Sequence, residues 1–464
     1  MRSYKMKPEP MSAKHRDGTI CVKPFMQSAI TSNGMFRVCC ECVFGKSTHP
    51  DLQFGKLRKE SGEYYTAQNS SIADTRNAPL LKEIRASMLR GEQHPECRQC
   101  WETEKLGVDS LRTYMNREYF DDLEKMKQNT QADGTINIAE IPVKYYDIRL
   151  GNKCNQKCRM CGPGDSSLWL DDWVKMGHKT IGFYDEHYEI KKDGERYSSE
   201  IGDWDKQPFV DDLKANMKDI DRIYMTGGEP TVIKEYWEIL QYAIDNDFAK
   251  NINLEYNSNM FIIPTNAWEI WSKFKRVRMT MSIDGLHDVQ DYIRFPSKWH
   301  IIERNIKKFY ELTKKYPNIS ATIAPTITIF NVMQMPDMVK WYTNNNFETF
   351  DATMALHICH GPKFLTMQNY PKARKQLVVD KYHEMFEWTT KNCSIALSEH
   401  LIKKYQSVID FLLADDIENQ LLGWDNTVTH KEEFLKHTEK LDIIRNQSLQ
   451  KSIPDLYEAV QYYE

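Results

Sequence analysis

Apolar and polar residues alternate along several short runs in the middle of the chain, and longer amphipathic runs lie between them. A strand is expected wherever every second residue is apolar. Six such runs lie between residues 143 and 360, at 143–150, 220–226, 251–258, 276–284, 319–330 and 349–357. Helical patterns separate them, as at 231–246 and 299–315. Strands that alternate with helices favour a parallel sheet with crossover helices, so we expect an α/β core.

The strand patterns also indicate what the sheet faces. In 276–284, Val277, Met279, Met281 and Ile283 alternate with a polar set. That polar set comprises Arg278, Thr280, Ser282 and Asp284. A closed barrel fills its interior with branched apolar side chains. Here the apolar face is expected to pack on the helices, which leaves a polar interior suited to a charged ligand. An open sheet with one solvated face is the alternative.

Composition narrows the class of protein. Of 464 residues, 62 are Lys or Arg and 66 are Asp or Glu, giving a net charge of −4. This balance argues against nucleic-acid binding. The first twenty residues are polar, and no stretch of eighteen apolar residues occurs, so neither a signal peptide nor a membrane span is expected. We expect a cytoplasmic protein, where eleven cysteines are more readily explained by metal binding or chemistry than by disulfides.

Three cysteines lie within eight residues directly after the first expected strand. The stretch "GNKCNQKCRMCGPG" at 151–164 spaces Cys154, Cys158 and Cys161 as C-x3-C-x2-C. The loops after β-strands are where β/α enzymes place their chemistry. A tetrahedral zinc site would require a fourth ligand. Three thiolates on a four-iron cluster instead leave one iron open to a small molecule.

This spacing resembles the signature of the radical SAM superfamily, which carries it after the first strand of a partial (βα)6 barrel. "MTGGEP" after the second strand resembles the family's GGE motif, which binds the amino group of S-adenosylmethionine. The glycines would allow the backbone to approach the cofactor closely, and the glutamate carboxylate would pair with the cofactor's ammonium group. "NSN" and "SIDG…YIR" resemble later cofactor-contacting segments. The resemblance implies these cofactor contacts: Gly227, Gly228, Glu229, Pro230, Asn257, Ser258, Asn259, Ser282, Asp284 and Arg294. Arg294 has a second reading as a solvated helix residue.

The resemblance implies a reductive mechanism. An electron from a [4Fe–4S] cluster cleaves S-adenosylmethionine, and the resulting 5′-deoxyadenosyl radical abstracts hydrogen from a substrate. An external one-electron donor of the flavodoxin or ferredoxin type is implied as a partner. The family suggests a peptide or protein side chain as substrate. The alternatives are a dehydrogenase of a small alcohol or sugar, and a non-catalytic metal-binding partner protein.

A second cysteine set precedes the expected barrel. Cys21, Gly34 and Cys39 are spaced C-x12-G-x4-C, and Cys97 and Cys100 form a C-x2-C pair. The set resembles the twitch domain, the short relative of the SPASM domain, which holds an auxiliary [4Fe–4S] cluster. The resemblance implies Cys21, Cys39, Cys97 and Cys100 as ligands and a second cluster that transfers electrons. Such domains ordinarily follow the barrel. A structural zinc ion is the alternative occupant, and Cys40 the alternative to Cys39.

Four regions are therefore expected: a polar segment at 1–20, a small α+β twitch-like domain at 21–112, the partial β/α barrel at 143–360, and a helical C-terminal region at 361–464. The charged insertion at 185–207 is a surface element or a substrate lid. The C-terminal helices form a cap or a partner surface. On a late strand, His357 and Cys359 share one side and are candidate catalytic groups, or else core residues.

Overall fold

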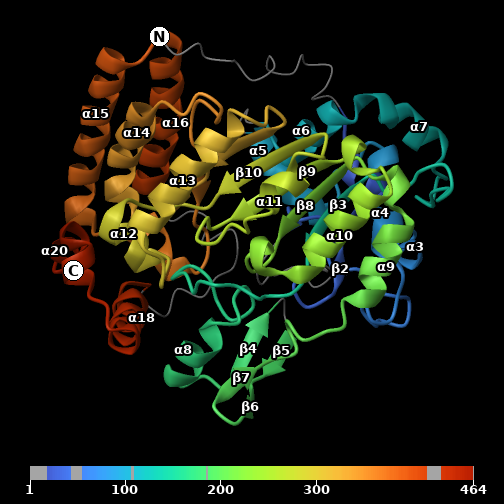
Figure 1. The fold of residues 1–464 in the computed structure, drawn as a ribbon, viewed down its shortest axis with the longest axis horizontal. Coiled ribbons are helices and arrows are strands. Elements are labelled where there is room, and N and C mark those ends of the chain that lie inside the picture. Colours follow the sequence, from blue (N-terminus) through green and yellow to red (C-terminus); the bar gives the residue numbers. More distant parts are fainter. Residues whose placement is uncertain (1–17, 43–54, 106–108, 184–185, 415–429, 463–464) are drawn as a thin grey trace.

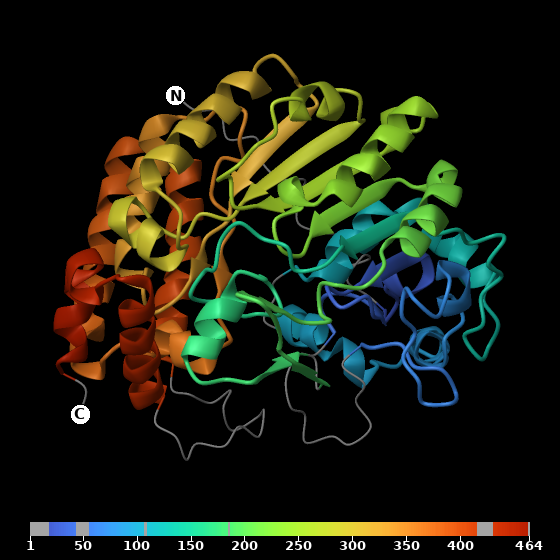
Figure 2. The same ribbon diagram turned by 60° about the horizontal axis from the view of Figure 1, so that its bottom comes forward.

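The computed structural model describes residues 18–42, 55–105, 109–183, 186–414 and 430–462. Its centre is a seven-stranded sheet in the order β11-β10-β9-β8-β3-β1-β2. The sheet curves into an arc with helices along its outer side (Figures 1 and 2). The expected α/β core with a parallel sheet and a helical C-terminal region is confirmed, and this arrangement fits a partial barrel.

Five of the predicted strand runs give the parallel part of the sheet. The strands are β3 (Tyr145–Arg149), β8 (Arg222–Thr226), β9 (Asn253–Ser258), β10 (Arg276–Met281) and β11 (Ile319–Ile323). The helices between and after them are α9 (Gln207–Ala215), α10 (Lys234–Asp245), α11 (Ala267–Trp271), α12 (His287–Ile293), α13 (Trp299–Thr313) and α14 (Met335–Asn345). The run at 319–330 divides into β11 and the separate β12 (Thr326–Ile327).

The sixth run, 349–357, differs from the prediction. Phe350 makes one parallel bridge to Ala321, and the chain then forms the short β13 (His357–Ile358), which pairs with β12. The apolar alternation continues through this stretch, but the Asp351 amide donates to Ala321 and the Ala355 amide to Ile323, so four residues of this chain span two of β11 and the ladder is interrupted by a bulge. The barrel therefore closes less far on this side than six equal strands would.

The alternation within the strands gives the central sheet one apolar face and one polar face. Val277, Met279 and Met281 are fully buried beneath the outer helices. The register aligns a polar row on the opposite face of the sheet. That row consists of Asp147, Tyr224, Glu255, Arg278 and Ser320. The inner face of the arc is thus polar, as the strand pattern predicts.

The N-terminal region joins the central sheet. Strand β1 (Gln27–Ile30) pairs in parallel with β3, and β2 (Phe36–Arg37) continues the sheet in the antiparallel direction. Its helices are α2 (Lys23–Met26), α3 (Ile72–Thr75), α4 (Pro79–Leu89), α5 (Arg98–Lys105), α6 (Leu111–Glu118) and α7 (Leu123–Gln128). The region therefore attaches at the β3 edge, beside the strand that leads into the cysteine-rich stretch (Figure 2).

The first crossover carries the predicted insertion. After α8 (Trp169–Lys175) come two antiparallel hairpins, β4 (Thr180–Phe183) with β5 (Glu186–Glu189) and β6 (Lys191–Asp193) with β7 (Arg196–Ser198). They project below the sheet in Figure 1. Trp204, which follows them, donates a hydrogen bond from Nε1 to the Ser32 carbonyl at 2.8 Å. The insertion is thereby anchored to the turn between β1 and β2.

The C-terminal region is helical. It comprises α15 (Lys375–Asn392), α16 (Ile395–Leu413), α18 (His430–Arg445), α19 (Leu449–Ser452) and α20 (Pro454–Val460). These helices stand beside α12, α13 and α14 at the β11 end of the sheet (Figure 1). No helix in the described ranges has the length and apolar character needed to cross a bilayer. Residues 1–17 of the expected polar N-terminal segment lie outside the described residues.

Candidate functional site

Residues 151–164, here called the cysteine loop, follow β3 directly at its carboxyl end. Cys158 is buried, while Cys154 and Cys161 are half-buried. The thiol of Cys161 forms a hydrogen bond with Cys158, which lowers the pKa of Cys158. Burial raises the pKa of Cys154 to about 12, and the nearby Cys158 adds to the shift. Three thiols gathered in one loop are a donor set suited to an iron–sulfur cluster.

The two glycines of the "GGEP" segment lie against the cysteine loop. A Cβ added at Gly228 would stand 2.1 Å from the Lys153 carbonyl oxygen, and one at Gly227 would stand 3.0 Å from the Gly151 oxygen. Gly227 also has a φ of +113°, which side chains rarely adopt. The amide of Glu229 donates to the Lys153 carbonyl at 2.9 Å. The segment therefore holds the loop backbone, and any residue larger than glycine would displace the loop.

Glu229 is almost fully buried, and its carboxylate accepts four hydrogen bonds. Oε1 accepts from Ser258 Oγ at 2.9 Å and from both the hydroxyl and the amide of Thr231. Oε2 accepts from the Asn259 amide at 2.7 Å. Burial raises the pKa of Glu229, and these bonds oppose the shift. The carboxylate thus joins the "GGEP" turn to the end of β9, a structural role that the sequence pattern did not reveal.

The "NSN" residues end β9 beside the cysteine loop. Asn259 Nδ2 donates to Asn155 Oδ1 at 2.7 Å and lies 4.0 Å from Cys154 Sγ. Asn257 Nδ2 donates to the Tyr224 hydroxyl at 2.7 Å on the polar face of the sheet. The Ser282 amide donates to the Ser258 carbonyl and so keeps the ends of β9 and β10 together.

Asp284 and Arg294 form a buried pair that reaches the loop. Arg294 Nε donates to Asp284 Oδ2 at 2.5 Å, and Arg294 Nη1 lies 3.8 Å from Cys158 Sγ. Burial opposes the charge, yet Asp284 and Cys158 together raise the pKa of Arg294. The other carboxylate oxygen, Oδ1, accepts from the Thr326 amide at 2.7 Å. Arg294 is thus a buried cation beside a thiol rather than a solvated helix residue.

His357 lies on β13, in the two-stranded sheet that β13 forms with β12, and Cys359 directly follows this strand. The side chain of His357 is exposed at its edge, but neighbouring atoms partly desolvate the imidazole and lower its pKa. The Asp284 carboxylate opposes that shift. Cys359 is buried, and its thiol donates to the Gly361 carbonyl at 3.2 Å. Burial raises the pKa of Cys359 to about 11. Both residues lie in the electrostatic field of Asp284, but their catalytic role stays a prediction.

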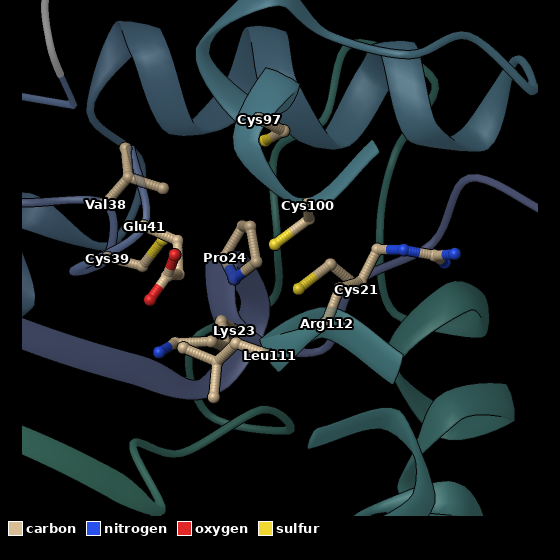
Figure 3. A pocket seen from close by; sticks show the side chains of 10 residues that line it. All are labelled: Cys21, Lys23, Pro24, Val38, Cys39, Glu41, Cys97, Cys100, Leu111 and Arg112. Carbon is tan, nitrogen blue, oxygen red and sulfur yellow. The ribbon is translucent and has the colours of Figure 1, made fainter. Parts of the chain in front are cut away.

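The four cysteines of the second set line one cavity, here called the thiol cavity (Figure 3). Its walls are Cys21, Lys23, Pro24, Val38, Cys39, Glu41, Cys97, Cys100, Leu111 and Arg112. In Figure 3 the sulfur atoms of Cys21 and Cys100 point toward one another. In the described ranges, no three His, Cys, Asp or Glu side chains converge closely enough for a single metal ion. The thiols surround a space instead of meeting at a point.

Cys39 and its neighbour Cys40 have different surroundings. Cys39 lines the thiol cavity and lies 3.8 Å from Cys42, sulfur to sulfur. The hydrogen bond with Cys42 lowers the pKa of Cys39 to about 6, with further help from Lys23 and Arg37. Cys40 instead receives a hydrogen bond from Lys23 Nζ at 3.7 Å. These contacts favour Cys39 over Cys40 as the ligand.

Sequence reasoning missed three polar residues of this cavity: Lys23, Glu41 and Arg112. Lys23 is buried, with its ammonium 5.3 Å from the centre of the Tyr145 ring. Arg112 is paired with Glu104 and donates to the Ile20 carbonyl at 2.8 Å. Lys23 and Glu41 each lie two residues after a predicted ligand, Cys21 and Cys39, whereas Arg112 comes from the more distant α6. Cys42 was also unassigned, although its C-x2-C spacing from Cys39 was a readable signal.

The cysteine loop lies within the part of the chain that matches a known protein family. Residues 148–341 match the family described as the Radical SAM superfamily. No curated protein matches the chain.

Among solved structures, the chain is similar to anSMEcpe with bound AdoMet and the Cp18Cys peptide, at 15% sequence identity. The alignment has a TM-score of 0.33 and covers 53% of this chain and 60% of anSMEcpe. It is also similar to SuiB of Streptococcus suis bound to the precursor peptide SuiA, at 13% sequence identity. That alignment has a TM-score of 0.33 and covers 67% of this chain and 63% of SuiB. The chain thus spans less than two thirds of the length of either protein.

Proposed function

We propose, since residues 148–341 of this chain are a radical SAM domain, that the protein is an enzyme that cleaves S-adenosylmethionine reductively at the cysteine loop. The resulting 5′-deoxyadenosyl radical would oxidise a peptide or protein side chain. The observation that carries this proposal is the cysteine loop at the carboxyl end of β3, held by Gly227 and Gly228. Two of its thiols are only half-buried, so a group bound to them would remain accessible to a small molecule.

Each of the residues around the loop would have a distinct task. Cys154, Cys158 and Cys161 would hold a [4Fe–4S] cluster. When bound, such a cluster and S-adenosylmethionine supply the 5′-deoxyadenosyl radical that abstracts hydrogen. Arg294 offers a fixed positive charge beside Cys158, suited to the cofactor carboxylate or to the charge of the cluster itself. Asn257, Ser258 and Asn259 present amide and hydroxyl groups at the end of β9.

The thiol cavity would hold the second [4Fe–4S] cluster through Cys21, Cys39, Cys97 and Cys100. Its thiols surround a space, and a four-iron cube with four thiolate ligands fills a space where a zinc ion occupies a point. Four protein ligands leave no open iron, so we assign this cluster to electron transfer. The reducing electron for the cysteine loop would come from a flavodoxin- or ferredoxin-type donor.

The inner face of the sheet offers a surface for a peptide. The half-buried part of the polar row, from Tyr224 to Ser320, presents carboxylate, hydroxyl and guanidinium groups, which match the amides and polar side chains of a peptide. This face also lies between the cysteine loop, which follows β3, and Tyr145, which contacts Lys23 of the thiol cavity. A side chain bound there would be reachable from both sites.

Anaerobic reconstitution tests the proposal directly. The intact protein should take up about eight irons per chain, four for each cubane. With dithionite and S-adenosylmethionine it should release methionine and 5′-deoxyadenosine. Stoichiometric zinc in place of half the iron would show that the thiol cavity is a structural site. Full iron loading without any 5′-deoxyadenosine would refute the assignment of the cysteine loop.

A further inference from the structure

Arg159 links the cysteine loop to the rest of the protein. It lies between Cys158 and Cys161, and its side chain is fully buried. Its amide donates to the Ile293 carbonyl at 2.8 Å, and Nε donates to the Tyr292 carbonyl at 3.1 Å. The guanidinium carbon stands 3.7 Å from the centre of the Tyr292 ring. A buried cation of this kind requires a carboxylate partner, because an unpaired charge is costly to bury.

The partner carboxylate comes from α18, in the C-terminal region. Asp442 Oδ1 accepts from Arg159 Nη2 at 2.5 Å and from the Tyr292 hydroxyl at 2.8 Å. Its other oxygen, Oδ2, accepts from the Leu449 amide at 2.7 Å. Gln447 Oε1 also accepts from Arg159 Nη2, at 3.2 Å. One carboxylate therefore joins the cysteine loop, α12 and the α18–α19 turn.

A second ion pair connects the end of α18 to the residue before Cys158. Arg445 Nε donates to Asp172 Oδ2 at 2.7 Å, and Lys157 Nζ donates to Asp172 Oδ1 at 2.6 Å. Asp172 and Arg445 are both almost fully buried as side chains. The Arg445 guanidinium also stacks on Trp169, at 4.4 Å from the ring centre.

Trp169 completes this connection on the loop itself. Its Nε1 donates to the Cys158 carbonyl at 3.0 Å. Arg159, on one side of Cys158, is therefore held directly by Asp442 of α18. Lys157, on the other side, is held by Asp172 of α8, which Arg445 of α18 fixes in turn. Helix α18 lies outside residues 148–341, the span matched to the radical SAM superfamily.

We propose that α18 is the outer wall of the radical SAM cluster site, with Asp442 and Arg445 as positioning residues for the cysteine loop. The inference rests on the proposed function, because it assumes a cluster on Cys154, Cys158 and Cys161. It assigns the C-terminal region a task within the site: keeping Arg159 and Lys157 in place so that the three thiols stay gathered. Loss of a group that orients a metal ligand often lowers metal affinity by 10- to 100-fold.

The test uses the full chain, reconstituted anaerobically, with four variants. Asp442→Leu and Arg159→Met each remove one partner of the buried pair. The double variant Arg159→Met/Asp442→Leu replaces the pair with apolar side chains of similar size, which buried sites often tolerate. Glu439→Gln removes an exposed charge from the same helix and serves as the matched control.

The readouts are the rate at which a chelator removes iron and the EPR spectrum of the reduced clusters with and without S-adenosylmethionine. We expect Asp442→Leu to lose half of the iron at least about tenfold faster than the wild type and to lose the EPR change caused by S-adenosylmethionine. The other half of the iron should stay as in the wild type. The double variant should recover most of the retention, because the two changes are coupled. Glu439→Gln should behave as the wild type.

Two results would overturn the inference. One is wild-type iron retention in Asp442→Leu. The other is equal, simultaneous loss of both clusters together with a lowered Tm, which would indicate a general contribution of α18 to folding. Failure of the proposed function is visible separately, in a comparison of the wild type with Cys158→Ala. If both take up the same amount of iron, the loop holds no cluster for α18 to support.

Discussion

The three cysteines of the loop lie within eight residues, whereas the four cysteines of the thiol cavity come from segments between Cys21 and Cys100. The support of each site follows the opposite pattern. The cysteine loop is bound through Arg159 to Asp442, which lies 283 residues away along the chain. The walls of the thiol cavity all belong to residues 21–112. A compact ligand motif can therefore depend on the whole fold, while a dispersed one can be enclosed by its own region.

The two sites also place a buried cation beside a thiol. Arg294 lies 3.8 Å from Cys158 Sγ in the loop, and Lys23 lies 3.7 Å from Cys40 Sγ near the cavity. Arg294 is held by Asp284, whereas Lys23 contacts the Tyr145 ring. The charge of Arg294 is therefore fixed by an ion pair, whereas that of Lys23 lies over an aromatic ring.

The largest expected effect separates the two sites by removing one ligand. Cys158→Ala should abolish 5′-deoxyadenosine formation, because two thiolates cannot hold the cubane or present its open iron. Iron should fall from about eight to about four per chain, since the thiol cavity is left intact. Product analysis and iron content measure both. Undiminished 5′-deoxyadenosine would show that the loop is not the site of cleavage.

Removal of the other site should have a narrower effect. Cys97→Ala/Cys100→Ala should lose one cluster and form no product from the substrate, while cleavage of S-adenosylmethionine continues uncoupled. Circular dichroism must first show a folded protein, because loss of a metal centre can unfold a small region. Normal turnover would exclude a catalytic role for the cavity. Loss of all cleavage would instead show that electrons enter through it.

Lowering the pH should destabilise the cysteine loop more than the thiol cavity, because the buried His437 lies on α18, the helix that packs beside the loop. His437 on this helix packs between Trp169 and Phe364, and burial together with Arg159 and Arg445 lowers its pKa to about 4. Between about pH 6.5 and pH 4 the unfolded chain binds this proton and the folded chain does not, so stability falls as the pH decreases. From pH 7 to pH 5 the loss should be about 1–2 kcal/mol.

Urea unfolding at the two pH values measures this effect. The variant His437→Phe should show a smaller decrease in the free energy of unfolding over the same interval, because its ring cannot be protonated. Iron on the cysteine loop should also become more labile than iron in the thiol cavity at pH 5. An identical pH dependence in the variant would exclude His437 as a source of the effect.

The smallest expected effect concerns the potential of the auxiliary cluster. Lys23→Met removes a buried positive charge from the wall of the thiol cavity, so reduction of the bound cluster becomes less favourable and its potential decreases. Lys23→Arg keeps the charge and should retain most of the potential. An EPR-monitored redox titration measures both variants. Equal potentials in the wild type and Lys23→Met would show that the charge is screened from the cluster.

The sequence by itself determined the features that depend on spacing and alternation. The spacing of Cys154, Cys158 and Cys161 identifies the loop because its ligands are neighbours in the chain. Strict alternation predicted β9 and β10 with their apolar and polar faces, because side chains in a strand alternate between faces. In α4 the apolar residues Leu81, Ile84 and Met88 recur at helical spacing, and all three are buried.

Only the tertiary structure decided which distant groups meet. The hydrogen bonds of Glu229 with Ser258 and Asn259, the attachment of β1 to β3, and the pairing of Arg159 with Asp442 each join segments without a shared local pattern. The weak sixth strand belongs here as well, since its length depends on what β11 and β12 offer as partners. Periodicity records whether a residue is buried, but the identity of its partner is set by chain packing across hundreds of residues.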